Sequence, residues 1–350
     1  MSAARILTVA ILLLAGSSKF SRAADPSPIL IDEAAPRFLG ATPRLWSAIF
    51  SPDSKSLAVT AGWENPDEPG ELVLWNVDAR RPTFIRRQDK TIRTVAFSRD
   101  GKLLAIGDFA GGTALIDPTT GQVTTTFPAH SKLVNSVAFT PDSKSLVAGS
   151  FDGTITVLDI TTGNVRHTFE LPGEMVVSVA VSSDGSTLAA VTWQGNAHVW
   201  DLPKRNKLHT LVAIKEIPGR SAIAEALAFA PDGKTFVTGS WDTTLRLWNI
   251  GTGKPVRDLI GHRSAIHNAA FAPDGTTLAT TDARGELWLC NPATGKELTS
   301  WNAHTDRCFG LAFSVDGKRL ATASWDHTAK IWDTETRLVI ATLTRDKPRE

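Results

Sequence analysis

The chain has 350 residues, of which 42% are hydrophobic and 21% are charged. This composition is typical of a soluble globular protein and excludes a disordered or fibrous chain. The 37 basic and 36 acidic residues nearly balance, which argues against binding to nucleic acid or to an anionic membrane surface.

The first residues are typical of an export signal. Arg5 precedes an apolar run over residues 6–15, and Ser21 and Ala23 stand where signal peptidases prefer small residues. The run is too short to span a bilayer. We therefore predict a signal peptide over residues 1–23 and a secreted or periplasmic mature protein. Cleavage after Ala23 removes three basic residues and leaves 34 basic and 36 acidic residues.

A short motif, apolar-Ala-Phe followed by Ser-Pro-Asp-Gly-Lys or a close variant, occurs seven times in the chain. Its third residue, here called the marker, stands at Phe50, Phe97, Phe139, Val181, Phe229, Phe271 and Phe313. Successive markers are 47, 42, 42, 48, 42 and 42 residues apart. A regular interval of this length indicates a repeat architecture.

Each repeat contains four segments with the length and composition of β-strands. The first strand ends at the marker, and Asp-Gly or Asp-Ser then forms a tight turn, because these residues tolerate a positive φ. Second strands are expected at 103–107, 146–150, 236–240 and 320–324, third strands at 154–160, 244–250 and 328–334, and fourth strands at 122–127 and 255–260. The segments are apolar on both faces, so one repeat cannot bury its own surfaces.

Seven such units are predicted to close into an all-β, seven-bladed β-propeller with four antiparallel strands per blade. The expected boundaries are an N-terminal segment at 24–36, the propeller at 37–345 and a C-terminal tail at 346–350. Residues 338–343 are favoured as the fourth strand of the last blade. Residues 28–39 are the alternative candidate for closing the ring.

The two cysteines, Cys290 and Cys308, exclude a disulfide framework but permit one bridge. Both stand at positions where the repeat predicts buried side chains. Two free thiols in the core are therefore favoured over a bridge.

The repeats resemble the WD40 family over residues 37–345. Trp200-Asp201 and Trp332-Asp333 reproduce the dipeptide of that family, and Trp75-Asn76 and Trp248-Asn249 are close variants. The pairs Gly261-His262, Ala129-His130 and Ala303-His304 match its Gly-His corner. The resemblance implies the propeller fold and a role as a binding scaffold.

The resemblance also implies a hydrogen-bonded tetrad of His, Ser or Thr, Asp and Trp in well-formed blades. Only blade seven has all four, as His304, Ser324, Asp326 and Trp332. The partial sets are His130, Ser150, Asp152 and Leu158 in blade three; Arg220, Ser240, Asp242 and Trp248 in blade five; His262, Arg284 and Cys290 in blade six; and Gln88, Asp108, Ala110 and Ile116 in blade two. A structural role is favoured over a catalytic triad, because the tetrad fixes blade geometry.

The residue before the turn Asp is aromatic in five blades and predicts an exposed aromatic rim. We define the top face as the side formed by the turns between second and third strands and by the connections between blades. The rim residues are Phe109, Phe151, Trp193, Trp241 and Trp325, with Trp63 as an expected sixth member. Such side chains can stack on a peptide, a glycan or an apolar patch of a partner. The alternative is that each packs against a neighbouring blade.

The position four residues before the marker is expected to line the mouth of the central channel. It carries seven different side chains: Trp46, Arg93, Asn135, Val177, Glu225, His267 and Phe309. This variety at equivalent positions suggests a specificity surface. The alternatives are a simple Glu225–His267 pair and neutral drift. Two insertions, at 64–70 and 212–218, enlarge loops on the same face.

Scaffold, enzyme and purely structural roles are the competing functions. A hydrolase or lactonase-like propeller would need several metal ligands at the channel mouth, where only Asn135, Glu225 and His267 qualify and Arg93 opposes a cation. The sequence has no Cys-x-x-Cys-His haem motif, no paired-cysteine zinc motif and no His-Glu-x-x-His. We therefore predict a non-enzymatic scaffold without metal or cofactor that binds a protein, peptide or glycan through its top face. A purely structural role in an envelope assembly is the third possibility.

Overall fold

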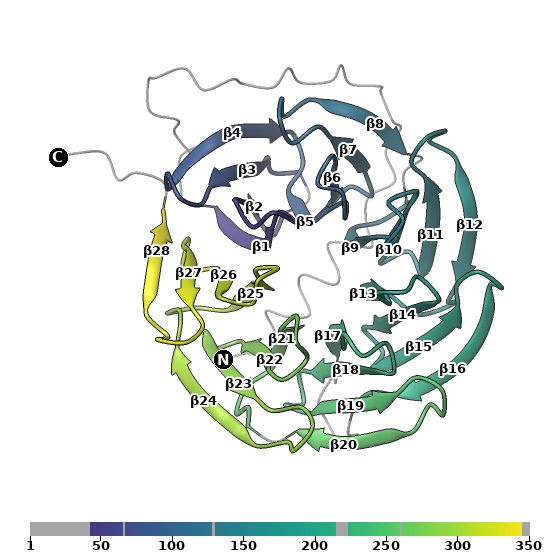
Figure 1. Ribbon diagram of the computed structural model, residues 1–350. Helices are drawn as coiled ribbons and strands as arrows, with labels where there is room; N and C mark the ends of the chain where they lie inside the picture. Colours follow the sequence, from purple (N-terminus) through teal and green to yellow (C-terminus); the bar gives the residue numbers. More distant parts are fainter. Residues whose placement is uncertain (1–42, 66, 128–129, 215–222, 260, 345–350) are drawn as a thin grey trace.

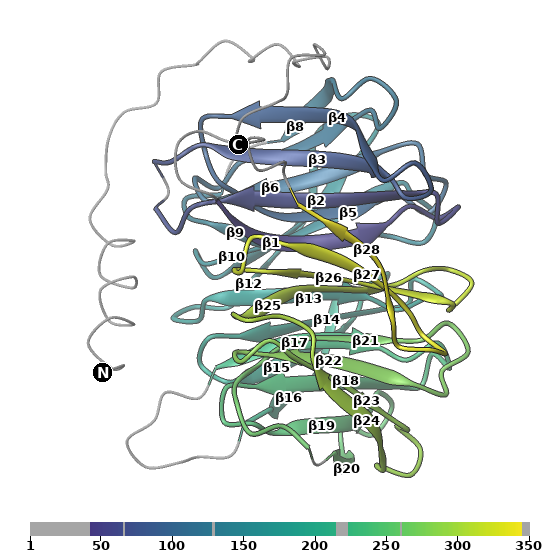
Figure 2. The ribbon, with the colours of Figure 1, turned by 90° about the vertical axis from the view of Figure 1, so that its left-hand side faces the viewer.

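The computed structural model describes residues 43–344, apart from residues 66, 128–129, 215–222 and 260. Within this range the chain forms seven separate four-stranded antiparallel sheets, which surround a central axis as the blades of a ring (Figure 1). Four consecutive strands make up each blade, so the predicted seven-bladed β-propeller is confirmed. Figure 2 shows the strands running from one face of the ring to the other.

The first four blades hold sixteen strands. Blade one has β1 (Arg44–Phe50), β2 (Ser56–Gly62), β3 (Gly70–Asn76) and β4 (Arg81–Gln88). Blade two has β5 (Ile92–Phe97), β6 (Leu104–Asp108), β7 (Thr113–Ile116) and β8 (Val123–Phe127). Blade three has β9 (Val134–Phe139), β10 (Ser145–Ser150), β11 (Thr154–Asp159) and β12 (Val165–Glu170). Blade four has β13 (Val176–Val181), β14 (Thr187–Thr192), β15 (Asn196–Asp201) and β16 (Asn206–Val212).

The last three blades follow the same order. Blade five has β17 (Ala224–Phe229), β18 (Thr235–Ser240), β19 (Leu245–Asn249) and β20 (Pro255–Leu259). Blade six has β21 (Ile266–Phe271), β22 (Leu278–Asp282), β23 (Glu286–Cys290) and β24 (Glu297–Asn302). Blade seven has β25 (Cys308–Phe313), β26 (Arg319–Ser324), β27 (Ala329–Asp333) and β28 (Val339–Leu343). In every blade the first strand is innermost and the fourth is outermost (Figure 1).

Every first strand ends on its marker residue, as the repeat predicts. In the turn that follows, the residue after Asp has a positive φ in all seven blades: Ser54, Gly101, Ser143, Gly185, Gly233, Gly275 and Gly317. The Asp contributes through its side chain. In blade one, Asp53 accepts hydrogen bonds from the Ser51 hydroxyl and from the Lys55 N–H. The turn therefore needs both residues, one for its side chain and one for its backbone conformation.

One cluster of buried apolar side chains lies at each of the seven interfaces between neighbouring blades. Alternate residues of a strand point to opposite faces of its sheet. In β2, Leu57 and Val59 therefore face blade seven, whereas Ala58 faces blade two. This arrangement explains why the strands are apolar on both faces.

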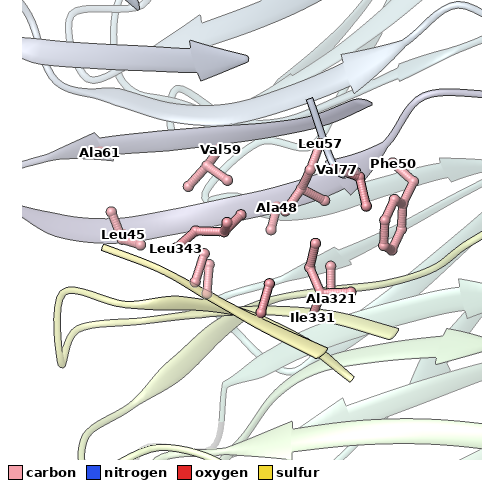
Figure 3. Close-up of a cluster of buried hydrophobic side chains, with 13 residues drawn as sticks. Leu45, Ala48, Phe50, Leu57, Val59, Ala61, Val77, Ala321, Ile331 and Leu343 are labelled. Carbon is pink, nitrogen blue, oxygen red and sulfur yellow. The ribbon is translucent and has the colours of Figure 1, made fainter. Parts of the chain in front are cut away.

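The ring closes where blade one packs against blade seven (Figure 3). Leu57 shares a buried cluster there with Ile331 of β27 and Leu343 of β28. The two blades approach closely: a Cβ atom added to Gly310 would lie 2.8 Å from the backbone nitrogen of Ala48. Among the described strands, none is shared between the two blades. The C-terminal strand β28 is the fourth strand of blade seven, as the sequence analysis favoured.

Cys290 and Cys308 are both buried free thiols, which confirms the favoured interpretation. Burial raises the pKa of Cys290 to about 11, so this thiol stays protonated near neutral pH. In the range that the structure describes, no helix is long and apolar enough to cross a membrane. The predicted signal peptide, the alternative closing segment 28–39 and residues 346–350 lie outside the described residues.

Candidate binding face at the channel mouth

A β-bulge displaces one residue near the start of every innermost strand. The pairing between first and second strands skips a single residue in each blade: Trp46, Arg93, Asn135, Val177, Glu225, His267 and Phe309. A bulge breaks the alternation of a strand and re-aims its extra side chain. All seven side chains line one small cavity at the axis. The expected convergence of these positions is confirmed, and the bulges are its cause.

Glu225 lies at the centre of a polar network that crosses the axis. Its carboxylate accepts hydrogen bonds from His267 Nδ1 at 2.7 Å and from the Trp241 indole nitrogen at 2.5 Å. From the opposite side, Arg93 Nη2 lies 3.5 Å from Glu225 Oε1. The Glu225–His267 pair named as an alternative is therefore present, and Arg93 of blade two extends it across the ring.

The Arg93 side chain lies between aromatic rings and polar groups. Its guanidinium carbon is 4.8 Å from the ring centroid of Trp46 and 5.2 Å from that of Phe309, distances at which a cation is attracted to an aromatic face. Arg93 Nε donates to Asn135 Oδ1 at 2.9 Å. The His267 ring stacks on Phe309 with 4.2 Å between centroids. The chain's own side chains therefore fill most of the mouth.

Burial and neighbouring charges shift the pKa values of Glu225 and Arg93 in opposite directions. Burial favours the neutral form of Glu225, yet His267, Arg93 and Trp241 together hold the pKa of Glu225 below its ordinary value. Burial lowers the pKa of Arg93, and the charge of Glu225 opposes that shift. Glu225 thus carries a negative charge that its neighbours already neutralise.

The cavity that these residues leave is small. It opens to solvent and has a volume of about 100 Å³, enough for roughly three water molecules. Both Glu225 oxygens face donors of the chain, and a cation bound there would meet Arg93. Among the described residues, no group of three or more His, Cys, Asp or Glu side chains is placed to hold a metal ion.

Five of the six aromatic residues of the expected rim, all except Trp63, form one cluster with Trp46, Val177 and Phe309 of the channel mouth. Trp325 lies 5.1 Å from both Trp46 and Phe309, measured between ring centroids. Trp193 bridges Phe151 and Trp241 at 5.8 and 5.7 Å. The cluster also contains Phe109, which contacts Trp46 at 5.6 Å. These contacts link the blades around the axis on the top face.

The expectation of an exposed aromatic rim is wrong for half of its members. Phe109, Phe151 and Trp325 are each only 8% exposed, because neighbouring aromatic rings cover them. Trp325 is also covered by the Arg44 and Arg307 guanidinium groups, at 4.0 and 4.8 Å from its ring centroid. Trp63, Trp193 and Trp241 remain partly exposed.

The first inserted loop joins β2 to β3, as predicted. Glu64 of this loop pairs with Arg44 at 2.6 Å, and Asp67 pairs with Lys90 at 2.7 Å. Both pairs lie near the protein surface. Most of the second insertion, at 212–218, lies outside the described residues.

Comparison with known proteins identifies the repeats. The family model of the WD domain, G-beta repeat, matches residues 121–159, 163–201, 212–249, 253–288 and 295–333, more than half of the chain. The protein belongs to the WD40 family. No curated protein sequence matches the chain. Four of the five matched WD40 repeats begin before the fourth strand of one blade and reach the third strand of the next, so the repeat and the blade are offset by one strand. The match at 212–249 begins at the last residue of β16.

The WD40 tetrad of blade seven is present, but its hydroxyl comes from Thr322 and not from Ser324. Trp332 Nε1 donates to Thr322 Oγ1 at 2.9 Å, and Thr322 Oγ1 lies 2.7 Å from His304 Nε2. His304 Nδ1 in turn lies 2.9 Å from Asp326. Ser324 instead donates to the backbone oxygen of Asp306. Alternation along β26 places residues 322 and 324 on the same face, so the sequence pattern alone did not separate them.

Blade six keeps more of the WD40 tetrad than the sequence suggested. Arg284 stands at the predicted Asp position, but Asp282 supplies the carboxylate, 3.3 Å from His262 Nδ1. His262 Nε2 lies 2.5 Å from Thr280. Cys290 replaces the Trp, as predicted. The prediction that Arg284 leaves this blade without its carboxylate is wrong, because the carboxylate lies two residues earlier in the chain.

The other blades show further variants of the WD40 tetrad. In blade three, His130 contacts Asp152 at 3.1 Å and Thr156 at 2.9 Å, while Ser150 donates to a backbone oxygen. In blade five, Trp248 donates to Thr238 and not to Ser240; Arg220 lies outside the described residues.

Blade two retains one contact of the tetrad, a hydrogen bond from Gln88 to Asp108 at 3.3 Å, and Ala110 and Ile116 take no part in it. Blade four reverses the roles, with Glu174 on the connection and His198 on the third strand, 3.1 Å apart.

Replacing Thr322 by valine is expected to lower the free energy of unfolding by about 1–3 kcal/mol, because it leaves a buried indole N–H and a buried imidazole nitrogen without partners. Urea unfolding followed by tryptophan fluorescence measures the change. Ser324→Ala is the matched control in the same strand. A larger loss in Ser324→Ala than in Thr322→Val would contradict the assignment of Thr322 to the tetrad.

Proposed function

We propose that this WD40 propeller is an exported, non-enzymatic scaffold that binds a protein partner through its top face. WD40 propellers are commonly protein-interaction scaffolds, and the chain belongs to that family. The observation that carries the proposal is the pair of partly exposed indoles, Trp193 and Trp241, that the rigid ring holds next to the channel mouth on the top face. Export rests on the apolar leader at residues 6–15.

The partly exposed indoles supply the contact surface in this proposal. Trp193 and Trp241 lie side by side in blades four and five, 5.7 Å apart between ring centroids. Trp241 is fixed from below through its hydrogen bond to Glu225. Aromatic side chains held rigidly and partly exposed are frequent anchors of protein interfaces, because little conformational entropy is lost on binding. Of the buried members of the expected rim, Phe151 packs edge-on against Trp193.

The alternative is a hydrolase or lactonase-like enzyme with its site at the channel mouth. Three features make it the weaker candidate. The possible ligands Glu225 and His267 are bonded to each other, Arg93 would repel a metal cation, and the cavity of about 100 Å³ is too small for a substrate of ordinary size. A scaffold needs none of these groups to be free.

A binding experiment on the envelope fraction tests the proposal. Immobilised protein, a Trp193→Ala variant and a Val315→Ala variant are each incubated with the extract, with and without a chelator. Val315 is 61% exposed in the turn between β25 and β26 on the opposite face, so this variant is the control. We expect partners that the wild type and Val315→Ala retain equally and that Trp193→Ala binds about tenfold or more weakly.

The same experiment can contradict the scaffold function. Partner binding that is unchanged in Trp193→Ala would exclude the top-face indoles as the contact surface. A hydrolytic activity that the chelator abolishes, with no partner retained, would favour the enzyme.

A further inference from the structure

Among the residues that the structure describes, three blades have a turn between second and third strands that binds the incoming connection through a side-chain oxygen. That oxygen accepts a hydrogen bond from a backbone N–H of the connection. We call this place the corner of the blade. The pairs are Asp152 with Ser131 at 2.9 Å in blade three, Gln194 with Met175 at 2.9 Å in blade four, and Asp326 with Thr305 at 3.1 Å in blade seven.

Blade six lacks this oxygen at its corner. Arg284 stands at the turn position that Asp152 and Asp326 occupy in the other blades, and a guanidinium group cannot accept a hydrogen bond. Asp282 does not substitute at the corner, because its carboxylate is bonded to His262 and to the backbone N–H groups of Arg284 and Glu286. Arg263 corresponds in the repeat to Ser131 and Thr305.

The corner of blade six is also rich in positive charge. Arg263 and Arg284 are both exposed. The turn that contains Arg284 lies against the connection into blade seven, because Gly285 O accepts hydrogen bonds from the Ala303 and His304 N–H groups at 3.0 Å. That connection continues to Arg307, which stacks on Trp325. Three arginines therefore lie on adjoining segments of the top face.

Two carboxylates also lie on these segments, and each has one oxygen that accepts a hydrogen bond within the chain. Glu286 Oε2 accepts a hydrogen bond from the Trp288 indole at 3.3 Å, and Asp306 Oδ1 accepts one from the Arg307 backbone N–H at 2.7 Å. Across the described part of the chain, no ion pair within 4.0 Å joins Arg263, Arg284 or Arg307 to an acidic side chain. The corner of blade six thus has hydrogen-bond donors and positive charge, but it lacks the side-chain oxygen that accepts from the connection in blades three, four and seven.

We propose that the corner of blade six, between Arg263, Arg284 and Arg307, binds a carboxylate side chain from an acidic segment of the partner protein. This inference rests on the proposed scaffold function and specifies its partner. A partner carboxylate would accept a hydrogen bond from the Arg263 N–H, as Asp152 does from the Ser131 N–H in blade three. Guanidinium groups bind carboxylates through two parallel hydrogen bonds, which adds direction to the charge attraction.

Blade two provides the internal contrast. Its turn position is Ala110, so it too lacks the corner oxygen, but its connection carries the exposed acidic residue Asp89. The next residue, Lys90, already pairs with Asp67 at 2.7 Å, so it does not offset the charge of Asp89. Loss of the turn oxygen is therefore shared by two blades, whereas the positive charge that would attract an acidic partner is found at blade six.

A labelled acidic peptide tests the proposal. The probe is a fluorescein-labelled, end-capped peptide of alternating Glu and Gly, and its counterpart has Gln in place of Glu. Fluorescence anisotropy is measured at about 0.1 M ionic strength, where charges beyond about 10 Å are screened. We expect the Glu peptide to bind at least about tenfold more tightly than the Gln peptide.

Arg284→Asp is the decisive variant, because it gives blade six the corner carboxylate that blades three and seven already have. We expect it to weaken binding of the Glu peptide at least about tenfold while the melting temperature stays unchanged or rises. Lys234→Asp is the matched charge reversal, since Lys234 is exposed in the turn between β17 and β18 on the opposite face. We expect this control to bind the Glu peptide like the wild type.

Two outcomes would overturn the carboxylate site: equal binding of the Glu and Gln peptides, or an equal loss of binding in Arg284→Asp and Lys234→Asp. If envelope partners are lost in Trp193→Ala but retained in Arg284→Asp, the carboxylate site fails while the proposed scaffold function stands. If Trp193→Ala retains every partner, the proposed contact surface of indoles fails independently of the peptide result.

Discussion

Replacing Glu225 by leucine is expected to lower the free energy of unfolding by about 3–5 kcal/mol. The substitution leaves the Arg93 guanidinium buried without its ion-pair partner, and it removes the acceptor of His267 Nδ1 and of the Trp241 indole. A buried charge without a partner is costly because the protein interior does not solvate it as water does. Urea unfolding followed by tryptophan fluorescence measures the loss.

A double variant separates the effect of the unpaired charge from the loss of packing. In the Glu225→Leu background, a second change of Arg93 to methionine removes the unpaired charge and keeps an apolar side chain between Trp46 and Phe309. We expect the double variant to be more stable than Glu225→Leu alone. If the free energy of unfolding of Glu225→Leu falls by less than about 1 kcal/mol, the Glu225–Arg93 pair behaves like a solvated surface pair. That result would contradict a buried ion pair at the channel mouth.

Replacing Trp325 by alanine is also expected to cost about 3–5 kcal/mol of unfolding free energy. Trp325 packs against Trp46 and Phe309 and lies between two arginine side chains, so its removal opens a cavity that these groups cannot fill. Trp193→Ala, at the equivalent position of blade four, is the control. Trp193 is partly exposed, and its loss should cost markedly less. Thermal melting of the two variants under the same conditions makes the comparison.

Equal destabilisation by the two substitutions would contradict the division of the aromatic residues into buried supports and partly exposed contacts. That division determines which variant can report on binding. A Trp325→Ala variant that fails to bind a partner would show only that its fold is damaged, whereas Trp193→Ala reports on the surface itself.

Much of the fold was predictable because the marker and its turn are local signals. All seven markers end a first strand, including Phe50 and Phe97 of blades one and two, which lie before the residues that the family model matches. The turn after the marker needs one residue with a positive φ and one acceptor side chain, and both requirements are visible as Asp-Gly or Asp-Ser. Repetition at a nearly constant interval then fixed the number of blades.

The sequence predicted which seven residues line the channel mouth, but not how their side chains are oriented and contact one another. The seven positions were identified because each lies four residues before its marker. The bulge that turns their side chains toward the axis arises from pairing with the second strand, and the sequence of the first strand alone does not reveal it. The burial of Phe109 and Trp325 also went unpredicted. An aromatic residue at the end of a strand is compatible with exposure or burial, and contacts between blades decided the outcome. In the same way, tertiary contacts selected Thr322 over Ser324 and Asp282 over a turn residue.

The closure between blades one and seven has a mechanical consequence. Because β1 to β4 and β25 to β28 form separate sheets, the two ends of the described chain are joined across that boundary by apolar side chains and a few side-chain hydrogen bonds, such as Arg319 to Ser54 O at 2.8 Å. A force that pulls the ends apart would therefore act on side-chain packing and not on a ladder of backbone hydrogen bonds. We therefore expect the ring to open at this boundary before any blade unfolds.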